Sequence, residues 1–238
     1  MLVTTSWDDG DILDERVADM LDRHGLRGTF YLARNHRQER LSEPSIRRLA
    51  TRHEIGAHSL THPNLTRLDR AGKTQEIAGS KSWLEDVTGE SVTMFCYPLG
   101  QFDDETKDVV ISAGFRGGRT TGQFAVEPHQ DRYAIRTTLQ VHPALLRHGT
   151  IGDLSRYFLR QGAARGSAAL WLGTSMFFGW SRLANRLLAD AARDDSHVFH
   201  LWGHSWEIEE HGMWRACDAF LRSIVELGSE TRTNGEIC

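Results

Sequence analysis

The stretch LVTTSWDDG, residues 2–10, says more about the fold than any other part of the sequence. Its first half is short, apolar and rich in β-branched residues, and it ends in two aspartates and a glycine. This pattern predicts a buried β-strand that runs into a turn. Apolar residues then recur at helical spacing from Leu13 to His24, and Gly25 is expected to end that helix. The chain therefore begins with a strand followed by a helix.

The same alternation continues along the chain without a linker, a repeat or a low-complexity segment. Further strands are predicted at residues 28–32, 55–58, 91–97, 115–121, 133–139 and 197–206. Further helices are predicted to begin at Ser42 and to span about 69–87, 104–113 and 213–227. This alternation favours βα units around a parallel sheet or barrel. We expect one α/β domain over residues 1–238, with a mainly helical, insertion-like region at about 143–195.

Composition and charge narrow the class of protein. A chain of 238 residues with 39% hydrophobic and 25% charged residues can bury a sizeable core and is not typical of a disordered protein. The net charge of −4, with both signs scattered, provides no basic stripe for nucleic acid. The longest apolar run, residues 168–180, is too short for a transmembrane segment. We expect it to form a buried helix or a lid over a cleft, with contact to a lipid-linked substrate as the alternative.

The cysteines bear on the cellular setting. Cys96, Cys217 and Cys238 are odd in number and share no metal-ligand spacing, which favours reduced thiols over a disulfide framework. The first residues have neither the positive region nor the apolar region of a signal peptide. We therefore expect a cytoplasmic setting. The sequence leaves the oligomeric state open.

Two histidines four residues apart, His58 and His62, follow the strand predicted at 55–58. Because the carboxyl ends of parallel strands meet at one edge, these histidines are expected near the aspartates that end the first strand. Two histidines and one carboxylate are a common ligand set for a catalytic divalent metal, and we assign the carboxylate to Asp9. If the segment from His58 to His62 coils as a helix, both rings share one face. Imidazole and carboxylate ligands accept several divalent ions.

Asp8 remains available as a proton acceptor. A cation beside Asp9 would allow the adjacent carboxylate of Asp8 to stay ionised as the general base for a metal-bound water. Capping of the helix that follows is the alternative for Asp8.

His204 is the candidate general acid for an amine leaving group, because an imidazole has a suitable pKa. His200 is its rival, since both side chains point to the same side of an ideal strand.

Aromatic residues and one turn are candidates for binding substrate. Trp202 and Trp206 flank the candidate acid, and their faces suit the apolar side of a sugar ring, although packing in the core is an equal alternative.

The turn is Tyr97-Pro98-Leu99-Gly100, at the end of the strand predicted at 91–97. Pro98 has no N–H, so an oxyanion donor in this turn must be the backbone N–H of Leu99 or Gly100.

Taken together, these motifs resemble the polysaccharide deacetylases, the NodB-homology or carbohydrate esterase family 4 proteins. The motifs that carry the resemblance, in the family's order, are Ser6–Gly10, His58–Pro63, Phe95–Gly100, Asp131–Arg136 and Leu201–His204. The resemblance implies a distorted (β/α)7 barrel and a zinc-dependent N-deacetylase, with cobalt or nickel as other ions for the same site. It also implies that Asp8 is the base, that Asp9, His58 and His62 bind the metal, and that His204 is the acid.

One departure from the family concerns its third motif, which often carries an arginine that orients the base. This chain has Cys96 at that point, and neither Cys96 nor Tyr97 can form a bidentate pair with Asp8. Arg136, at the end of the fourth motif, is the predicted substitute.

The predicted activity is metal-dependent removal of an N-acetyl or other N-acyl group from an amino sugar or oligosaccharide. The expected partner is an N-acylated amino sugar, either small or lipid-linked. One alternative is an amidohydrolase that acts on a non-sugar C–N bond, similar to the allantoinases of the superfamily. The other is a carbohydrate-binding relative without catalysis, which the retained base, ligands and acid make less favoured.

Overall fold

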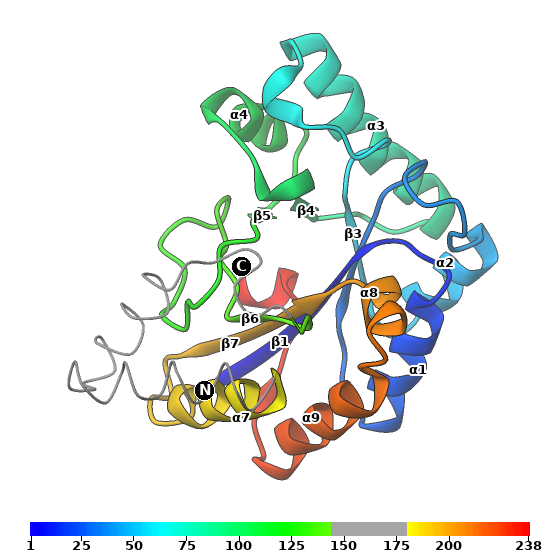
Figure 1. The fold of residues 1–238 in the computed structure, drawn as a ribbon. Coiled ribbons are helices and arrows are strands. Elements are labelled where there is room, and N and C mark those ends of the chain that lie inside the picture. The colour runs from blue at the N-terminus through cyan, green and yellow to red at the C-terminus, as the bar shows by residue number, and fades with distance from the viewer. Residues whose placement is uncertain (144–179) are drawn as a thin grey trace.

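A curled parallel sheet runs through the middle of the computed structural model, which describes residues 1–143 and 180–238 (Figure 1). Its strands are β1 (Leu2–Asp9), β2 (Thr29–Leu32), β3 (Glu54–Ala57), β4 (Met94–Cys96), β5 (Gly117–Arg119), β6 (Leu139–Gln140), β7 (Val198–Gly203) and β8 (Glu230–Thr231). They are arranged in the order β5-β4-β3-β2-β1-β7-β6, and β8 also pairs with β1. Every one of these pairs is parallel, which confirms the predicted α/β fold with a distorted barrel.

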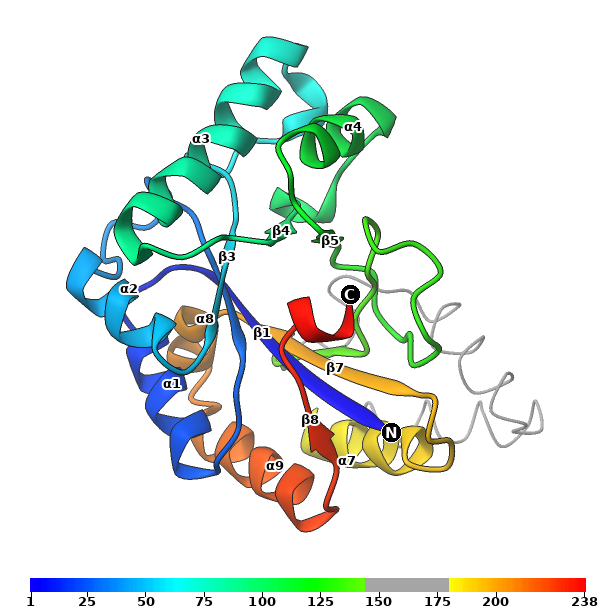
Figure 2. The same cartoon turned by 180° about the vertical axis from the view of Figure 1, so that it is seen from behind.

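Helices connect the strands and cover the outside of the curled sheet (Figures 1 and 2). The α-helices are α1 (Asp14–Arg23), α2 (Glu43–Ala50), α3 (Arg70–Thr88), α4 (Asp104–Ser112), α7 (Trp180–Ala191), α8 (Ser205–Glu210) and α9 (Trp214–Glu226). Short 3-10 turns are η1 (Leu65–Arg67), η2 (Pro98–Gly100) and η3 (Gly235–Ile237). Unlike the longer helices, η3 lies on the inner side of the sheet (Figure 2).

The side chains of β1 alternate between two environments, as a strand requires. Val3 and Trp7 belong to the hydrophobic core. Ser6 points to the other side, where its hydroxyl lies 2.8 Å from Nε2 of His200. Asp8 is on the same side as Ser6, whereas Asp9 has a φ of 83° that interrupts the alternation. Both carboxylates consequently reach the carboxyl-terminal edge of the sheet.

Several predicted strands are shorter in the structure, and two of these differences bear on the site. In the segment 133–139, only Leu139 is part of a named strand, while Ile135 forms a single parallel bridge with Arg119 of β5. This irregular segment lies between β5 and β6 and hydrogen-bonds to the backbone after β5. The strand predicted at 197–206 ends at Gly203, and α8 begins at Ser205. That early helix start becomes important for the candidate site.

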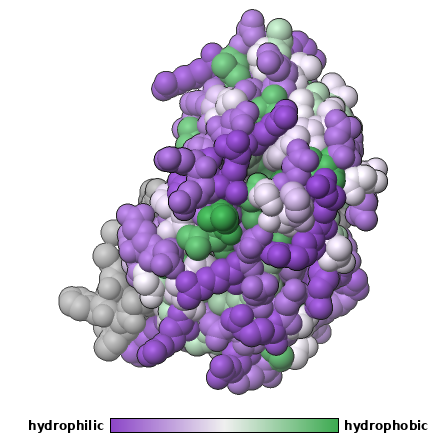
Figure 3. All heavy atoms as spheres, turned by 90° about the vertical axis from the view of Figure 1, so that its right-hand side faces the viewer, coloured by the Kyte–Doolittle hydropathy of each residue, from purple (hydrophilic) through white to green (hydrophobic). Residues whose placement is uncertain are grey.

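Part of the insertion-like region predicted at 143–195 lies outside the described residues, as does nearly all of the apolar run 168–180. The described end of the region forms α7, which buries Leu183 and Leu187 and contacts α9. Within residues 1–143 and 180–238, no helix is both long enough and apolar enough to span a bilayer. The face on the right of Figure 1 is largely hydrophilic, with scattered apolar patches (Figure 3).

Candidate active site

The carboxyl-terminal edge of the sheet surrounds a cavity of about 230 Å³. Its lining consists of Asp8, Asp9, His36, His58, His62, Tyr97, Leu99, Thr121, Trp202, His204 and Trp206. These side chains come from the ends of β1, β4 and β7, from the loops after β2, β3 and β5, and from α8. The structure thus brings the predicted ligands, base and acid together in one place.

Asp9 lies at the centre of this group. Nε2 of His58 and Nε2 of His62 each lie 3.7 Å from Oδ1 of Asp9. The Asp9 residue is 2% exposed, and its Oδ1 has no hydrogen-bond partner within the described residues. Burial alone raises the pKa of Asp9, but the facing rings of His204, His58, His62 and His36 lower it to about 2. A buried, ionised carboxylate that faces imidazole nitrogens fits a divalent cation.

The backbone orients His58 for this role. Its Nδ1 lies 2.8 Å from the carbonyl oxygen of Cys96, so that an Nδ1–H donor leaves Nε2 free to bind a metal. The segment after β3 is not helical, so a shared helical face is not what brings the two rings together. Ser59 and His62 have positive φ values of 65° and 57°, and the His62 N–H donates to Oγ of Ser59. A tight turn therefore brings the two imidazoles together, with ring centroids 4.7 Å apart.

His36, in the loop after β2, is a further possible ligand that no sequence motif predicts. Its Nε2 lies 3.7 Å from Oδ2 of Asp9, and its ring stacks on His62 with a centroid separation of 4.1 Å. Asp9, His36 and His62 can each offer one ligand atom within 4.8 Å of the others. In the sequence, His36 stands in a polar loop with no second histidine at a ligand spacing. Only its place in the fold reveals it.

The arginine that contacts the candidate base is Arg119, not Arg136. Arg119 is 0% exposed, and its Nη2 donates to Oδ1 of Asp8. Arg136 instead donates to the backbone carbonyl of Gln123 at 2.8 Å. Arg119 on β5 is the register partner of Cys96 on β4. The arginine expected at the third motif is therefore found on the adjacent strand, at the same height in the sheet.

The surroundings of Arg119 keep it charged and in place. Its Cζ lies 5.2 Å from the ring centroid of Tyr31 and 4.7 Å from that of Trp202. Burial alone lowers the pKa of Arg119, but the charge of Asp8 raises it overall. On the other side of Asp8, Sγ of Cys96 lies 3.8 Å from Oδ2, and burial raises the pKa of this thiol. Asp8 is thus fixed between a permanent cation and a neutral thiol.

The two candidate aromatic platforms have different surroundings. Trp202 is 1% exposed and faces the guanidinium of Arg119, so it supports the arginine rather than offering a ring face to a sugar. Trp206 is partly exposed. Its Nε1 donates to Oδ2 of Asp9 at 2.9 Å, and the Cζ of Arg37 lies 4.5 Å from its ring. Trp206 is therefore the better candidate for contact with substrate.

His204, rather than His200, faces the cavity. Nδ1 of His204 lies 2.7 Å from Oε2 of Glu207, and its Nε2 lies 3.9 Å from Oδ2 of Asp9. Burial lowers the pKa of His204 overall, and the charge of Asp9 opposes this effect only in part. His200 lies inside the curled sheet against Ser6. Glu207 reaches His204 because α8 begins immediately after β7, which the longer predicted strand does not allow.

Only part of the predicted substrate-binding turn is available to a ligand. Leu99 lines the cavity and is 52% exposed. The N–H of Gly100 donates to the carbonyl of Tyr97 at 2.8 Å, which leaves the N–H of Leu99 as the candidate oxyanion donor. The Tyr97 hydroxyl donates to the carbonyl of Tyr133, and Pro98 is buried. These two residues hold the turn in place.

Comparison with known sequences agrees with this arrangement. A family model described as polysaccharide deacetylase matches residues 2–118. The peptidoglycan-N-acetylmuramic acid deacetylase PdaC of Bacillus subtilis is 28% identical over 108 residues, which cover 44% of this chain and 23% of that protein. The peptidoglycan deacetylase of Helicobacter pylori is 23% identical over 107 residues, covering 45% of this chain and 36% of that protein. The matches span between 23% and 52% of the length of these curated relatives.

Solved structures share the fold over nearly the whole chain. A family 4 acetyl xylan esterase from Clostridium thermocellum, in complex with a cobalt ion, has a TM-score of 0.60 and 17% identity. That match covers 100% of this chain and 90% of the esterase. A carbohydrate esterase family 4 pseudoenzyme from Bacillus anthracis has a TM-score of 0.59 and 17% identity, covering 99% of this chain and 64% of that one. Because one of these proteins is a pseudoenzyme, the shared fold alone does not imply activity.

Proposed function

Because the chain belongs to the polysaccharide deacetylase family, we propose that it is a metal-dependent N-deacetylase of an acetylated amino sugar or oligosaccharide. The observation that carries the proposal is the buried Asp9 carboxylate, which two histidine nitrogens face at 3.7 Å beside a second, arginine-paired carboxylate. Amide hydrolysis needs an electrophile at the carbonyl, a proton acceptor for water and a proton donor for the amine. This cavity has side chains suited to all three tasks.

Asp9, His58 and His62 would hold one divalent ion, with His36 as a further donor. When bound, such an ion supplies a Lewis acid that polarises the amide carbonyl and makes water more acidic. We propose zinc, because two histidines and a carboxylate are a known ligand set of catalytic zinc sites. Cobalt and nickel accept the same donors.

Groups of this protein would then transfer the protons and stabilise the charge that develops on the substrate. Asp8, held by Arg119, accepts a proton from the attacking water. The N–H of Leu99 donates to the oxygen on which negative charge develops. His204, whose ring is oriented by Glu207, gives a proton to the departing nitrogen. The products are acetate and a free amino group on the sugar.

A metal-replacement assay tests this proposal. We expect chelator-treated protein to release no acetate from N-acetylglucosamine oligosaccharides, and added zinc, cobalt or nickel to restore the release. The variant Asp8→Asn should bind metal but release little acetate, because it keeps the shape of the carboxylate without its charge. A folded protein that releases no acetate from any N-acetylated sugar with any of these metals would contradict the proposal. Turnover of a ureide in the same assay would favour the allantoinase-like alternative.

We also propose a cytoplasmic setting, which the three unpaired thiols of Cys96, Cys217 and Cys238 support. Cell fractionation with a tagged chain tests it, and recovery outside the cytoplasm would contradict it.

A further inference from the structure

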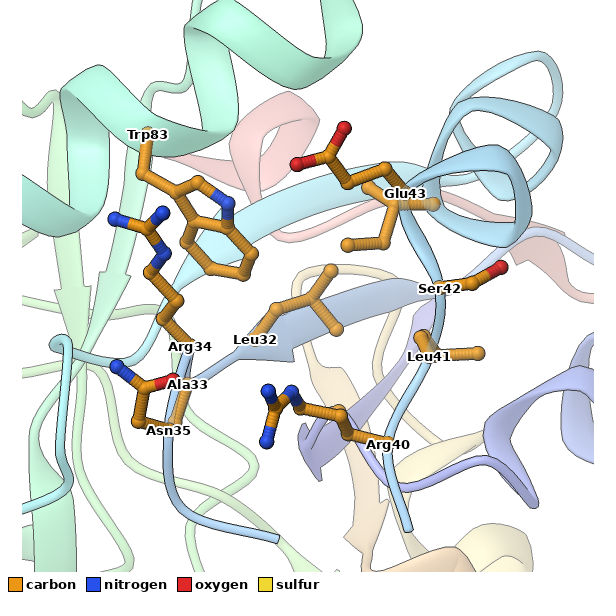
Figure 4. A pocket seen from close by; sticks show the side chains of 11 residues that line it. Leu32, Ala33, Arg34, Asn35, Arg40, Leu41, Ser42, Glu43 and Trp83 are labelled. Carbon is orange, nitrogen blue, oxygen red and sulfur yellow. The ribbon is translucent and has the colours of Figure 1, made fainter. Parts of the chain in front are cut away.

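A second cavity, of about 350 Å³, lies beside the candidate active site between the loop after β2, the start of α2 and α3 (Figure 4). We call it the Arg34 cavity; it is lined by Gly10, Leu32–Asn35, Arg40–Glu43, Ile46 and Trp83. Gly10 and Asn35 line this cavity, while the residues next to them in the chain, Asp9 and His36, line the active-site cavity. The turn after β1 and the loop after β2 therefore border both cavities.

Two exposed arginines supply positive charge there. Figure 4 shows Arg34 beside the indole of Trp83, and Arg40 on the opposite side of the cavity, in the part of the loop that leads to α2. The Cζ of Arg34 lies 5.7 Å from the Trp83 ring, and Arg40 has one long hydrogen bond, of 3.5 Å, to the carbonyl of Arg37. Neither Arg34 nor Arg40 has an ion pair within residues 1–143 and 180–238. By contrast, Arg37 in the same loop pairs with Asp11 at 2.9 Å.

The negative charge of the one carboxylate that lines the Arg34 cavity already has a partner. Glu43 is the carboxylate of the lining, and its Oε2 lies 3.8 Å from Nη1 of Arg47, one turn later in α2. The two guanidiniums of the cavity therefore leave an excess of positive charge for a ligand.

The loop that carries both arginines is fixed before any ligand binds. The N–H of Leu41 donates to the carbonyl of Gly10 at 3.0 Å, which ties the loop to the turn after β1. The N–H of Asn35 donates to the carbonyl of Leu60 at 2.8 Å, which ties it to the loop after β3. Such preorganisation lowers the entropy cost of binding.

The remaining walls suit a sugar ring. Leu32, Leu41 and Ile46 are buried at the base of the cavity, and Trp83 is half-buried at its side. Aromatic and aliphatic surfaces pack against the apolar face of a sugar, and guanidinium groups bind carboxylate or phosphate through paired hydrogen bonds. The volume lies at the lower end of the range for small-molecule sites, about 300–1,000 Å³.

We propose that the Arg34 cavity binds a sugar unit bearing a carboxylate or a phosphate, next to the unit that is deacetylated. This assignment rests on the proposed function, because it makes the preferred substrate an acidic rather than a neutral glycan. Arg34 and Arg40 contact the anionic group, and Trp83 contacts the ring.

Calorimetric titration of the full chain with four probes tests the proposal. The probes are N-acetylmuramic acid, N-acetylglucosamine 6-phosphate, neutral N-acetylglucosamine and inorganic phosphate. We expect both acidic sugars to bind more tightly than the neutral sugar, and the preference to shrink as salt is added. Arg34→Ala and Arg40→Ala should each weaken binding of the acidic sugars by about 5–20-fold, and of the neutral sugar by less than about twofold. Arg67→Ala, which removes an exposed arginine of η1, is the matched control and should change neither.

Several results would overturn the proposal. One is equal affinity of the unaltered chain for acidic and neutral sugars. Another is unchanged affinity for the acidic sugars when Arg34 and Arg40 are both replaced. If inorganic phosphate binds as tightly as the sugar phosphate and Trp83→Ala has no effect, the cavity holds an anion but no sugar, and the sugar assignment fails. Arginine-dependent binding without acetate release from any sugar would instead refute the proposed deacetylase alone. Acetate release without a preference for acidic sugars would refute the Arg34 cavity assignment alone.

Discussion

The two neighbouring cavities hold their charges in opposite ways. In the active-site cavity, Asp8 and Asp9 are each 2% exposed, and each faces fixed cationic or imidazole partners. In the Arg34 cavity, Arg34 and Arg40 are exposed and have no ion pair in the described part of the chain. Removing one partner of a buried charged pair is costly, whereas an exposed side chain can be replaced at little cost to stability. The first cavity should therefore determine whether the reaction occurs, and the second which glycan is preferred.

The largest effect is expected from the ligands of the active-site cavity. Asp9→Ala and His58→Ala should each abolish metal binding and lower acetate release by at least about a thousandfold for acidic and neutral sugars alike. Metal content by mass spectrometry and acetate assays measure both effects. Gln38→Ala, in the exposed loop after β2, is a control that should retain metal. If either variant kept its full metal content, the replaced residue would not be a metal ligand, which would contradict the role that we assign to the active-site cavity.

Arg119 should rank next, because it acts on the base and not on the metal. Arg119→Met should lower kcat by about a hundredfold or more and destabilise the fold by about 3–5 kcal/mol, since it leaves a buried carboxylate unpaired. Metal binding should persist. Arg136→Ala should retain most activity, because Arg136 bonds to the carbonyl of Gln123.

An exchange of residues tests the position of that arginine more directly. The double variant Cys96→Arg with Arg119→Cys should recover part of the kcat lost in Arg119→Met, because the two positions are register partners. Equal losses of kcat in Arg119→Met and Arg136→Ala would contradict the assignment. Steady-state kinetics with saturating metal gives the comparison.

His36→Ala should have an intermediate effect, which is confined to the affinity for the metal. We expect metal affinity to fall by about tenfold while kcat at saturating metal changes little, since Asp9, His58 and His62 remain. Competition with a chromophoric chelator measures affinity, and the absorption spectrum of the cobalt form reports a change in ligand number. An unchanged cobalt spectrum would show that His36 is not a ligand.

A smaller effect, restricted to one class of substrate, is expected in the Arg34 cavity. Arg34→Ala should raise KM for an acidic oligosaccharide by about tenfold and leave kcat unchanged, which is the signature of lost ground-state binding. For a neutral oligosaccharide, both constants should stay within about twofold of the unaltered chain. A fall in kcat for both substrates would contradict this prediction, because it would show that Arg34 also affects the reaction in the active-site cavity.

The smallest effect lies outside both cavities, where Asp218 of α9 contacts His24 at 3.1 Å and Arg23 at 3.4 Å at the end of α1. Burial raises the pKa of Asp218, but the hydrogen bond and charge of His24 and the charge of Arg23 lower it overall. Its carboxylate therefore stabilises the fold above about pH 4, and this contribution is lost as the pH falls through the lowered pKa. Asp218→Asn should cost about 0.5–1 kcal/mol at pH 7 and less near pH 3.

Urea unfolding at both pH values checks this prediction, with Glu226→Gln at the exposed end of α9 as the control. Acetate release should be unchanged in both variants. A cost for Asp218→Asn that is as large at pH 3 as at pH 7 would contradict the assigned ionisation.

The sequence predicts the centre of the site because that centre is encoded locally. The predicted base, ligands and acid all lie at the carboxyl end of a strand or in the first few residues after it, and the parallel sheet places all strand ends at one edge. Those residues are Asp8, Asp9, His58, His62 and His204. Their meeting point follows from topology, whatever the local conformation, as the non-helical turn from His58 to His62 shows.

The residues that support this centre depend on features that a linear pattern does not carry. Arg119 is placed by the register between β4 and β5, and His36 by the path of an irregular loop. Glu207 depends on a helix that begins one residue after His204. The same reason explains why Arg136 is predicted in place of Arg119, since a motif contains nearby residues and not neighbours across a sheet.

The pairing of Cys96 with Arg119 also bears on how this chain is compared with other sequences. A column-by-column comparison of motifs records only a cysteine where an arginine is expected. In space, Arg119 lies on the neighbouring strand, a spacing of about 4.8 Å from Cys96, and contacts Asp8. The partner of the base is thus better sought through the three-dimensional position of a charge than through one column of an alignment.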